Sequence, residues 1–185
     1  MKSPNFHADL REPRIGCMVH YSAGDFNSTV SWVCDPTSKV SYHVVIAGDG
    51  AAVQLVPWDA RAWHAGLCKP SRESRSYEDA NSAFYGIALS GGPAFGRPTD
   101  AQEQTLNSIL WDRFAEHHWP VSEWWRIVGH DTEAVHTKAS APEHPKLWGK
   151  RGRKADPTGD SHGYGPLNPW LSLEGVRAAL AATEQ

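Results

Sequence analysis

Residues 40–56 have the sequence VSYHVVIAGDGAAVQLV, which predicts two β-strands joined by a tight turn. Residues 40–47 are rich in valine, isoleucine and tyrosine, side chains that favour extended backbone. The GDG sequence at residues 48–50 is typical of a hairpin turn, because glycine and aspartate tolerate the unusual backbone angles found there. Residues 51–56 form the return strand, so the whole stretch predicts a β-hairpin.

Short apolar runs on both sides of the hairpin predict buried strands. These runs lie at residues 15–21, 84–90 and 126–129. The intervening residues 22–38 contain Gly, Asp, Asn, Ser and Pro and predict an irregular loop with one helical turn. Residues 1–13 are polar and predict an arm.

The segment 100–118 predicts a helix. Thr99 suits the N-cap position and Gln102 the third helical position, which together make a capping box. An apolar stripe with one charged edge follows at Leu106, Ile109, Leu110, Arg113 and Phe114. A long ordered loop at 131–169 and a final helix at 173–183 complete the predicted elements.

Composition narrows the classes of function. The 185 residues carry a formal net charge of −3, which argues against a general nucleic-acid binder. No apolar run is long enough to span a bilayer and no secretory h-region is visible, so we expect synthesis in the cytoplasm without membrane insertion. Cys17, Cys34 and Cys68 have no CxxC spacing and predict reduced thiols. No repeat divides the sequence, so residues 1–185 are predicted to form one α/β domain.

Ten histidines and nine tryptophans suggest a metal site or an aromatic-lined groove. His20 and His130 each end a short apolar run, and adjacent strand ends can bring such side chains together. Asp156 lies downstream in the sequence GRKADP, at residues 152–157. Two imidazoles and one carboxylate make a three-ligand zinc set with an open fourth position. Spacing alone does not single out this triple among ten histidines.

Several stretches, taken together, point to a known family. They are MVHYSAG at residues 18–24, VSYHVVIAGDGAAVQLVP at 40–57, RAWHAG at 61–66, NSAFYGIALSGG at 81–92, VGH at 128–130 and GRKADP at 152–157. With these stretches the chain resembles the zinc N-acetylmuramoyl-L-alanine amidases of the bacteriophage-lysozyme type. That family also includes cytosolic muropeptide-recycling amidases and animal peptidoglycan-recognition proteins.

The resemblance implies a fold, a cofactor and a reaction. The implied fold is a central mixed β-sheet flanked by α-helices, with the zinc site in a surface groove. His20, His130 and Asp156 match the Zn²⁺ ligands, and Lys154 matches a lysine that stabilises the oxyanion. Tyr42 matches a tyrosine that faces the metal, where it suits a hydrogen bond to the zinc-bound water or the oxyanion, or packing as a cross-strand aromatic. The implied reaction is hydrolysis of the amide between N-acetylmuramic acid and L-alanine in peptidoglycan or muropeptides. We expect the protein to be a monomer with no nucleic-acid partner.

The RAWHAG region supplies the predicted substrate contacts. His64 is expected to line the substrate groove. Trp63 and Trp58 suit either a sugar or peptide platform or core packing. Arg61 suits either a peptide carboxylate or a neighbouring aspartate. Asn81 matches the family pattern and is expected to fix the loop that enters the next strand.

The chain also departs from the family in two places. Recycling amidases carry a glutamate on the strand matched here by YGIALSG, where the candidate positions hold Ala88 and Ser90. The missing glutamate, with Tyr42 in its stead, favours a phage-type endolysin, which a holin would release to the wall. A recycling amidase and a non-catalytic peptidoglycan-binding module are the alternatives. Residues 131–153 form an extended insertion, either a solvated loop or a lid over the groove.

Overall fold

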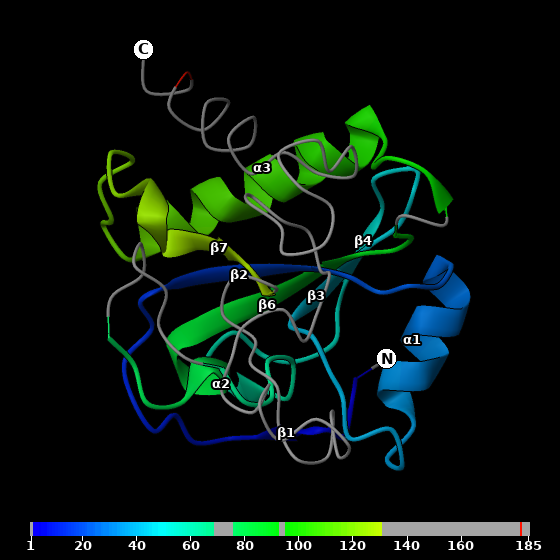
Figure 1. The fold of residues 1–185 in the computed structure, drawn as a ribbon, viewed down its shortest axis with the longest axis horizontal. Helices are drawn as coiled ribbons and strands as arrows, with labels where there is room; N and C mark the ends of the chain where they lie inside the picture. Colours follow the sequence, from blue (N-terminus) through cyan, green and yellow to red (C-terminus); the bar gives the residue numbers. More distant parts are fainter. Residues whose placement is uncertain (1, 69–75, 93–94, 131–181, 183–185) are drawn as a thin grey trace, which may run out of the picture.

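The computed structural model describes residues 2–68, 76–92, 95–130 and 182. Its centre is a five-stranded sheet in the order β4-β3-β6-β2-β7 (Figure 1). The strands are β2 (Gly16–Tyr21), β3 (Val44–Ile46), β4 (Ala52–Gln54), β6 (Phe84–Leu89) and β7 (Ile127–Gly129). β3 and β4 pair antiparallel, whereas β3–β6, β6–β2 and β2–β7 are parallel. The sheet is therefore mixed, as expected.

Helices cover both faces of this sheet, so the central strands are buried on both sides. In Figure 1, α3 (Asp100–Glu116) runs along one face, and α2 (Ala80–Ala83) lies on the other. Side chains alternate along a strand, so Val19 of β2 joins the cluster under α3 while Met18 joins the cluster with α2. His20 follows Val19 and so lies on the face away from α3. The predicted α/β class with a mixed sheet flanked by helices is confirmed.

Two local predictions are confirmed in detail. The hairpin turns at residues 48–50, where the Ala47 amide donates to the Ala51 carbonyl at 2.7 Å and Gly50 has a φ of 86°. The long helix α3 begins at the predicted capping box. The backbone N–H of Gln102 donates to Thr99 Oγ1, and the backbone N–H of Thr99 donates to Gln102 Oε1, both at 3.1 Å.

The loop predicted at residues 22–38 is wrong, because it contains the nine-residue helix α1 (Phe26–Cys34). Asp25 caps this helix by accepting from the Ser28 amide at 3.0 Å. The β-branched and small polar side chains of the segment are weak helix formers. Tertiary packing stabilises the helix instead, because Val33 is buried against the sheet with Phe26 and Val30 beside it.

The N-terminal arm is also more ordered than predicted. It contributes strand β1 (Phe6–His7), which pairs antiparallel with β5 (Arg61–Ala62) in a second, two-stranded sheet. Asn5 is buried, and its side-chain amide donates to the Asp35 carbonyl at 2.8 Å. The arm is therefore tied to the body of the molecule near the end of α1.

The strand predicted at 40–47 is shorter in the structure, because only Val44–Ile46 joins the ladder. Before it, the Ser41 amide donates to the Trp63 carbonyl at 3.1 Å, which draws the chain towards the 61–66 segment. A short 3-10 helix, η2 (Trp124–Arg126), precedes β7. The loop at 131–169 and the helix at 173–183 lie outside the described residues. Within the described part of the chain, no helix has both the length and the apolar character needed to cross a bilayer.

Candidate functional site

His20 and His130 are brought together by adjacent parallel strands. Val19 of β2 is in register with Gly129 of β7, so the next residue on each strand is one of the two histidines. Their ring centroids lie 4.6 Å apart, and both residues are buried, at 0% and 3% exposure. The sequence prediction that two strand ends bring these imidazoles together is therefore confirmed.

His64 lies directly behind His20. Its Nε2 is 3.1 Å from the Phe84 carbonyl, which can only accept, so this nitrogen carries the proton. His64 Nδ1 therefore accepts, and His20 Nε2, 3.1 Å away, donates to it. Burial, with the nearby His20 and His43, lowers the pKa of His64 well below its usual value and keeps the ring neutral.

His130 is oriented by a backbone carbonyl. Its Nε2 lies 2.8 Å from the oxygen of Ala65, so Nε2 carries the proton. In neutral His20 and His130 the lone pair is then on Nδ1. Histidines that bind metals almost always donate their other ring N–H to a carbonyl, carboxylate or similar acceptor. The two imidazoles therefore fit two positions of a zinc site.

Gly86 makes room for the supporting histidine. A Cβ at Gly86 would lie 2.4 Å from Cγ of His64, so only glycine allows the ring to rest against β6. The apolar run at residues 84–90 predicts a strand but does not by itself reveal this role of Gly86. An isolated glycine inside a strand is nevertheless a known sign of close approach by another group.

Tyr42 and Ala88 flank His20. The Tyr42 ring is half-buried and its centroid is 5.1 Å from that of His20. Ala88 of β6 is in register with His20 of β2, so the alanine occupies the nearest cross-strand position. Residue 88 therefore offers no carboxylate to His20. Tyr42, which has a phenolic hydroxyl, packs beside His20.

The other predicted contact residues are largely engaged within the protein. Arg61 is buried and its Nη1 lies 2.7 Å from Asp79 Oδ2. Of the two predicted partners, a peptide carboxylate or a neighbouring aspartate, the structure shows the aspartate. Trp58 packs against the α3 cluster and stacks on His43 at a centroid distance of 5.6 Å. Trp63 is half-buried and tilts against His7 at 5.2 Å.

Lys154, Asp156 and the insertion at 131–153 lie outside the described residues. Among the described residues, no group of three or more His, Cys, Asp or Glu side chains is arranged to hold a metal ion. Two of the three predicted ligands, His20 and His130, belong to the described part and lie together. The third, Asp156, does not.

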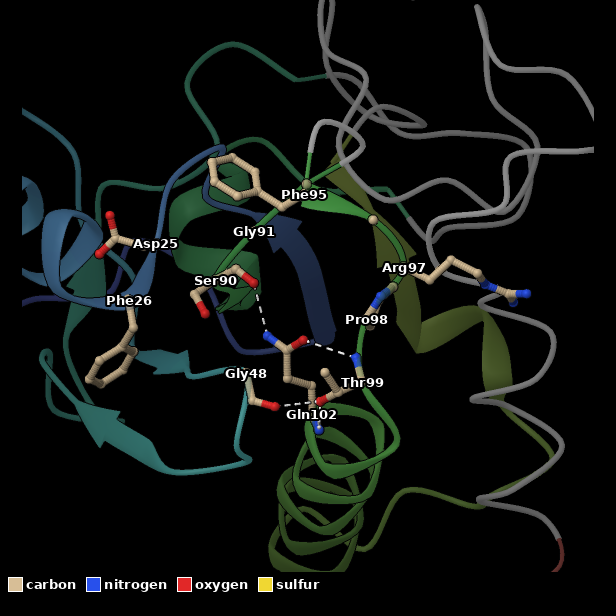
Figure 2. A pocket seen from close by; sticks show the side chains of 12 residues that line it. Asp25, Phe26, Gly48, Ser90, Gly91, Phe95, Arg97, Pro98, Thr99 and Gln102 are labelled. Atoms are coloured by element: carbon tan, nitrogen blue, oxygen red, sulfur yellow. Dashed lines mark hydrogen bonds between the residues drawn. The ribbon is translucent and has the colours of Figure 1, made fainter.

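A separate cavity of about 280 Å³ lies beyond the ends of β3 and β6. Figure 2 shows Phe95 and Arg97 on its rim, with Gln102 bonded across its floor to the Ser90 carbonyl. Among the described residues that line it, none is a predicted catalytic, metal-binding or substrate-binding residue. The cavity is therefore distinct from the histidine site.

Comparison with known proteins identifies relatives of the chain. The family model described as N-acetylmuramoyl-L-alanine amidase matches residues 11–159. The 1,6-anhydro-N-acetylmuramyl-L-alanine amidase AmpD of Escherichia coli is 41% identical over 71 residues, which cover 38% of this chain and 36% of that protein. The chain thus spans little more than a third of the length of this curated relative.

A second relative aligns along almost the whole chain. The N-acetylmuramoyl-L-alanine amidase AmiD of E. coli is 29% identical over 189 residues, covering 92% of this chain and 57% of that protein. A solved complex of AmiD with anhydro-N-acetylmuramic acid-L-Ala-D-gamma-Glu-L-Lys superposes with a TM-score of 0.53. It shares 26% identity and covers 72% of this chain and 52% of that one.

Proposed function

The chain belongs to the N-acetylmuramoyl-L-alanine amidase family, and from this we propose that it hydrolyses the amide between N-acetylmuramic acid and L-alanine. We propose that the enzyme depends on Zn²⁺, with His20, His130 and Asp156 as ligands. The observation that carries the proposal is the His20–His130 pair. Two buried imidazoles lie side by side, each donating from Nε2 and so presenting a lone pair on Nδ1.

Bound zinc supplies Lewis acidity at the scissile carbonyl and makes water a usable nucleophile near neutral pH. The histidines can serve it only as neutral rings, and their surroundings favour that form. His20 donates to a neutral His64, and His130 donates to a carbonyl. Asp156 would supply the anionic third ligand in this proposal.

The remaining chemistry falls to two side chains that donate hydrogen bonds. We propose that Tyr42, whose ring lies beside His20, donates a hydrogen bond from its phenolic O–H to the oxygen that becomes negative in the tetrahedral intermediate. Lys154 would contribute its positive charge to stabilising the same oxygen. Fixed donors aimed at developing charge lower the barrier to amide hydrolysis by stabilising the transition state.

Intact peptidoglycan is the substrate we propose first, as for a phage-type endolysin. Ala88 is in register with His20, and the two candidate positions for the glutamate of the recycling amidases hold Ala88 and Ser90. The Tyr42 ring lies 5.1 Å from the His20 ring, centroid to centroid, and packs in the same cluster as Ala88. This arrangement supports the tyrosine-containing branch of the family.

Soluble anhydromuropeptides are the second candidate substrate. The observation in their favour is similarity: 41% identity to AmpD of E. coli over 71 residues, and a fold shared with AmiD. AmpD is named for a 1,6-anhydro-N-acetylmuramyl substrate, and the solved AmiD complex contains an anhydro-N-acetylmuramic acid peptide. A recycling role for this chain would follow that chemistry.

One pair of digests tests the reaction and separates the two substrates. Purified cell walls and a soluble anhydromuropeptide are each incubated with the zinc-loaded enzyme, and newly freed amines are labelled. New N-terminal alanine supports the proposed bond, and the faster substrate identifies the role. New reducing sugar ends without new amines would exclude the amidase reaction. Absence of both products, in a protein that cannot be loaded with zinc, would indicate a binding module.

A further inference from the structure

We propose that Asn81 is a positioning residue for the metal centre, acting on both histidine ligands at once. The inference rests on the zinc site proposed above. It concerns a side chain on α2 that lies behind the ligands rather than among them. Its basis is a set of hydrogen bonds that links one amide to His20 and His130 through two consecutive residues.

The first step is the contact between Asn81 and the backbone of the 61–66 segment. Oδ1 of Asn81 accepts from the amide of His64 at 2.9 Å and from the amide of Ala65 at 2.8 Å. One oxygen therefore fixes two successive peptide units. The backbone of Asn81 is itself held in place, because its backbone N–H donates to Oδ1 of Asp79, the N-cap of α2, at 3.1 Å.

The second step carries this constraint to the ligands. The side chain of His64 accepts from Nε2 of His20, and the carbonyl of Ala65 accepts from Nε2 of His130. These are the two residues whose amides Asn81 holds. A shift of this backbone segment would therefore move both acceptors, and both imidazoles would lose the bonds that set their tautomer and orientation.

The third step is the contact between strand β6 and the ring of His64. β6 seats the His64 ring, because Gly86 leaves the space for it and the Phe84 carbonyl accepts from Nε2 at 3.1 Å. The ring is thus held by β6 and its backbone by Asn81. Residues that orient metal ligands commonly contribute about 10–100-fold to metal affinity, and we expect Asn81 to act at that scale.

The experiment compares two variants at this position with a matched control. Asn81→Leu removes the acceptor at similar size, whereas Asn81→Asp keeps an oxygen that can accept from both amides. Asn107→Leu makes the same chemical change on α3, on the other face of the sheet. Zinc affinity is measured by competition with a chromophoric chelator, and thermal unfolding of the zinc-free protein reports on the fold.

We expect Asn81→Leu to weaken zinc binding about 10–100-fold. Asn81→Asp and Asn107→Leu should bind zinc within a small factor of wild type. Equal zinc affinity in wild type and a folded Asn81→Leu variant would overturn the inference. It would leave the proposed function intact as long as wild type binds zinc and releases alanine amines. Failure of wild type to bind zinc would overturn both.

A measurement on the wild-type protein covers the case in which Asn81→Leu does not fold. Nitrogen NMR of the zinc-free protein reports which ring nitrogen of each histidine carries the proton. The inference requires Nε2–H in both His20 and His130. A proton on Nδ1 of either ring would contradict it, whatever the variants do.

Discussion

Nε2 of His20 lies 3.1 Å from Nδ1 of His64, and the far side of the His64 ring bonds the Phe84 carbonyl at 3.1 Å. Because the carbonyl can only accept, this chain of bonds has one direction. The proton on His20 must sit on Nε2, so the nitrogen on the opposite side of the ring is the one that can bind a metal.

His20→Ala should lose both zinc and amidase activity, because a ligand disappears and His64 loses the partner that donates to it. Zinc content by mass spectrometry and release of alanine amines give the two readouts. His118→Asn is a suitable control, since His118 is exposed and asparagine tolerates its left-handed φ of 52°. An active, metal-free His20→Ala enzyme would disprove the assignment.

Gly86→Ala should destabilise the protein by about 1–3 kcal/mol, the usual cost of overpacking a buried site. The new Cβ would meet Cγ of His64 at 2.4 Å, so the ring must move and zinc affinity should fall with stability. Urea denaturation and metal competition measure the two effects. Gly48→Ala is the control, because a Cβ there meets nothing within 4 Å. Equal behaviour of the two variants would contradict the packing argument.

Tyr42→Phe should lower kcat by about 10²-fold, the scale measured for loss of one oxyanion donor. Zinc affinity should stay the same, because phenylalanine keeps the ring that packs at 5.1 Å from His20. Steady-state kinetics on a soluble muropeptide separate kcat from KM. An unchanged kcat would show that the tyrosine serves packing alone.

Stability of the zinc-free protein should fall as the pH drops from 6.5 towards 4. Burial, together with Arg14, lowers the pKa of His43 to about 3, so the folded state keeps this ring neutral. The unfolded chain protonates His43 near pH 6.5 and therefore binds more protons throughout this window. Stability then rises with pH, by about 1 kcal/mol per pH unit from this residue.

Urea denaturation at a series of pH values checks this dependence. The buried, neutral His64 has a lowered pKa and adds to the slope in the same direction. Asp25 and Asp35 also have lowered pKa values, from hydrogen bonds with Ser28 and Thr37, but their contributions are lost at lower pH. A flat stability between pH 6.5 and 4 would contradict the burial of a neutral His43.

Local sequence predicted the elements whose signals are contained within a few residues. Thr99 and Gln102 satisfy each other across one turn, so the capping box could be identified without the rest of the fold. The GDG turn is equally local. Helix α1 could not be predicted this way, because its stability depends on Val33 reaching the far-away β3 and β6 strands.

The same division holds for the candidate site. That His20 and His130 end apolar runs and that GRKADP follows could be predicted from the sequence, because these are properties of short segments. Only the tertiary structure decided that β2 and β7 are neighbours in register, which brings the two rings to 4.6 Å.

The supporting residues were decided by the tertiary structure as well. The prediction that His64 lines the groove came from its motif, whereas the folded chain buries it to 5% exposure with both ring nitrogens engaged. Asn81, Gly86 and Ala65 acquire their roles only when α2, β6 and the 61–66 segment meet. Hydrogen bonds and close packing between segments distant in sequence leave little trace in any one of them, and for that physical reason the fold had to supply them.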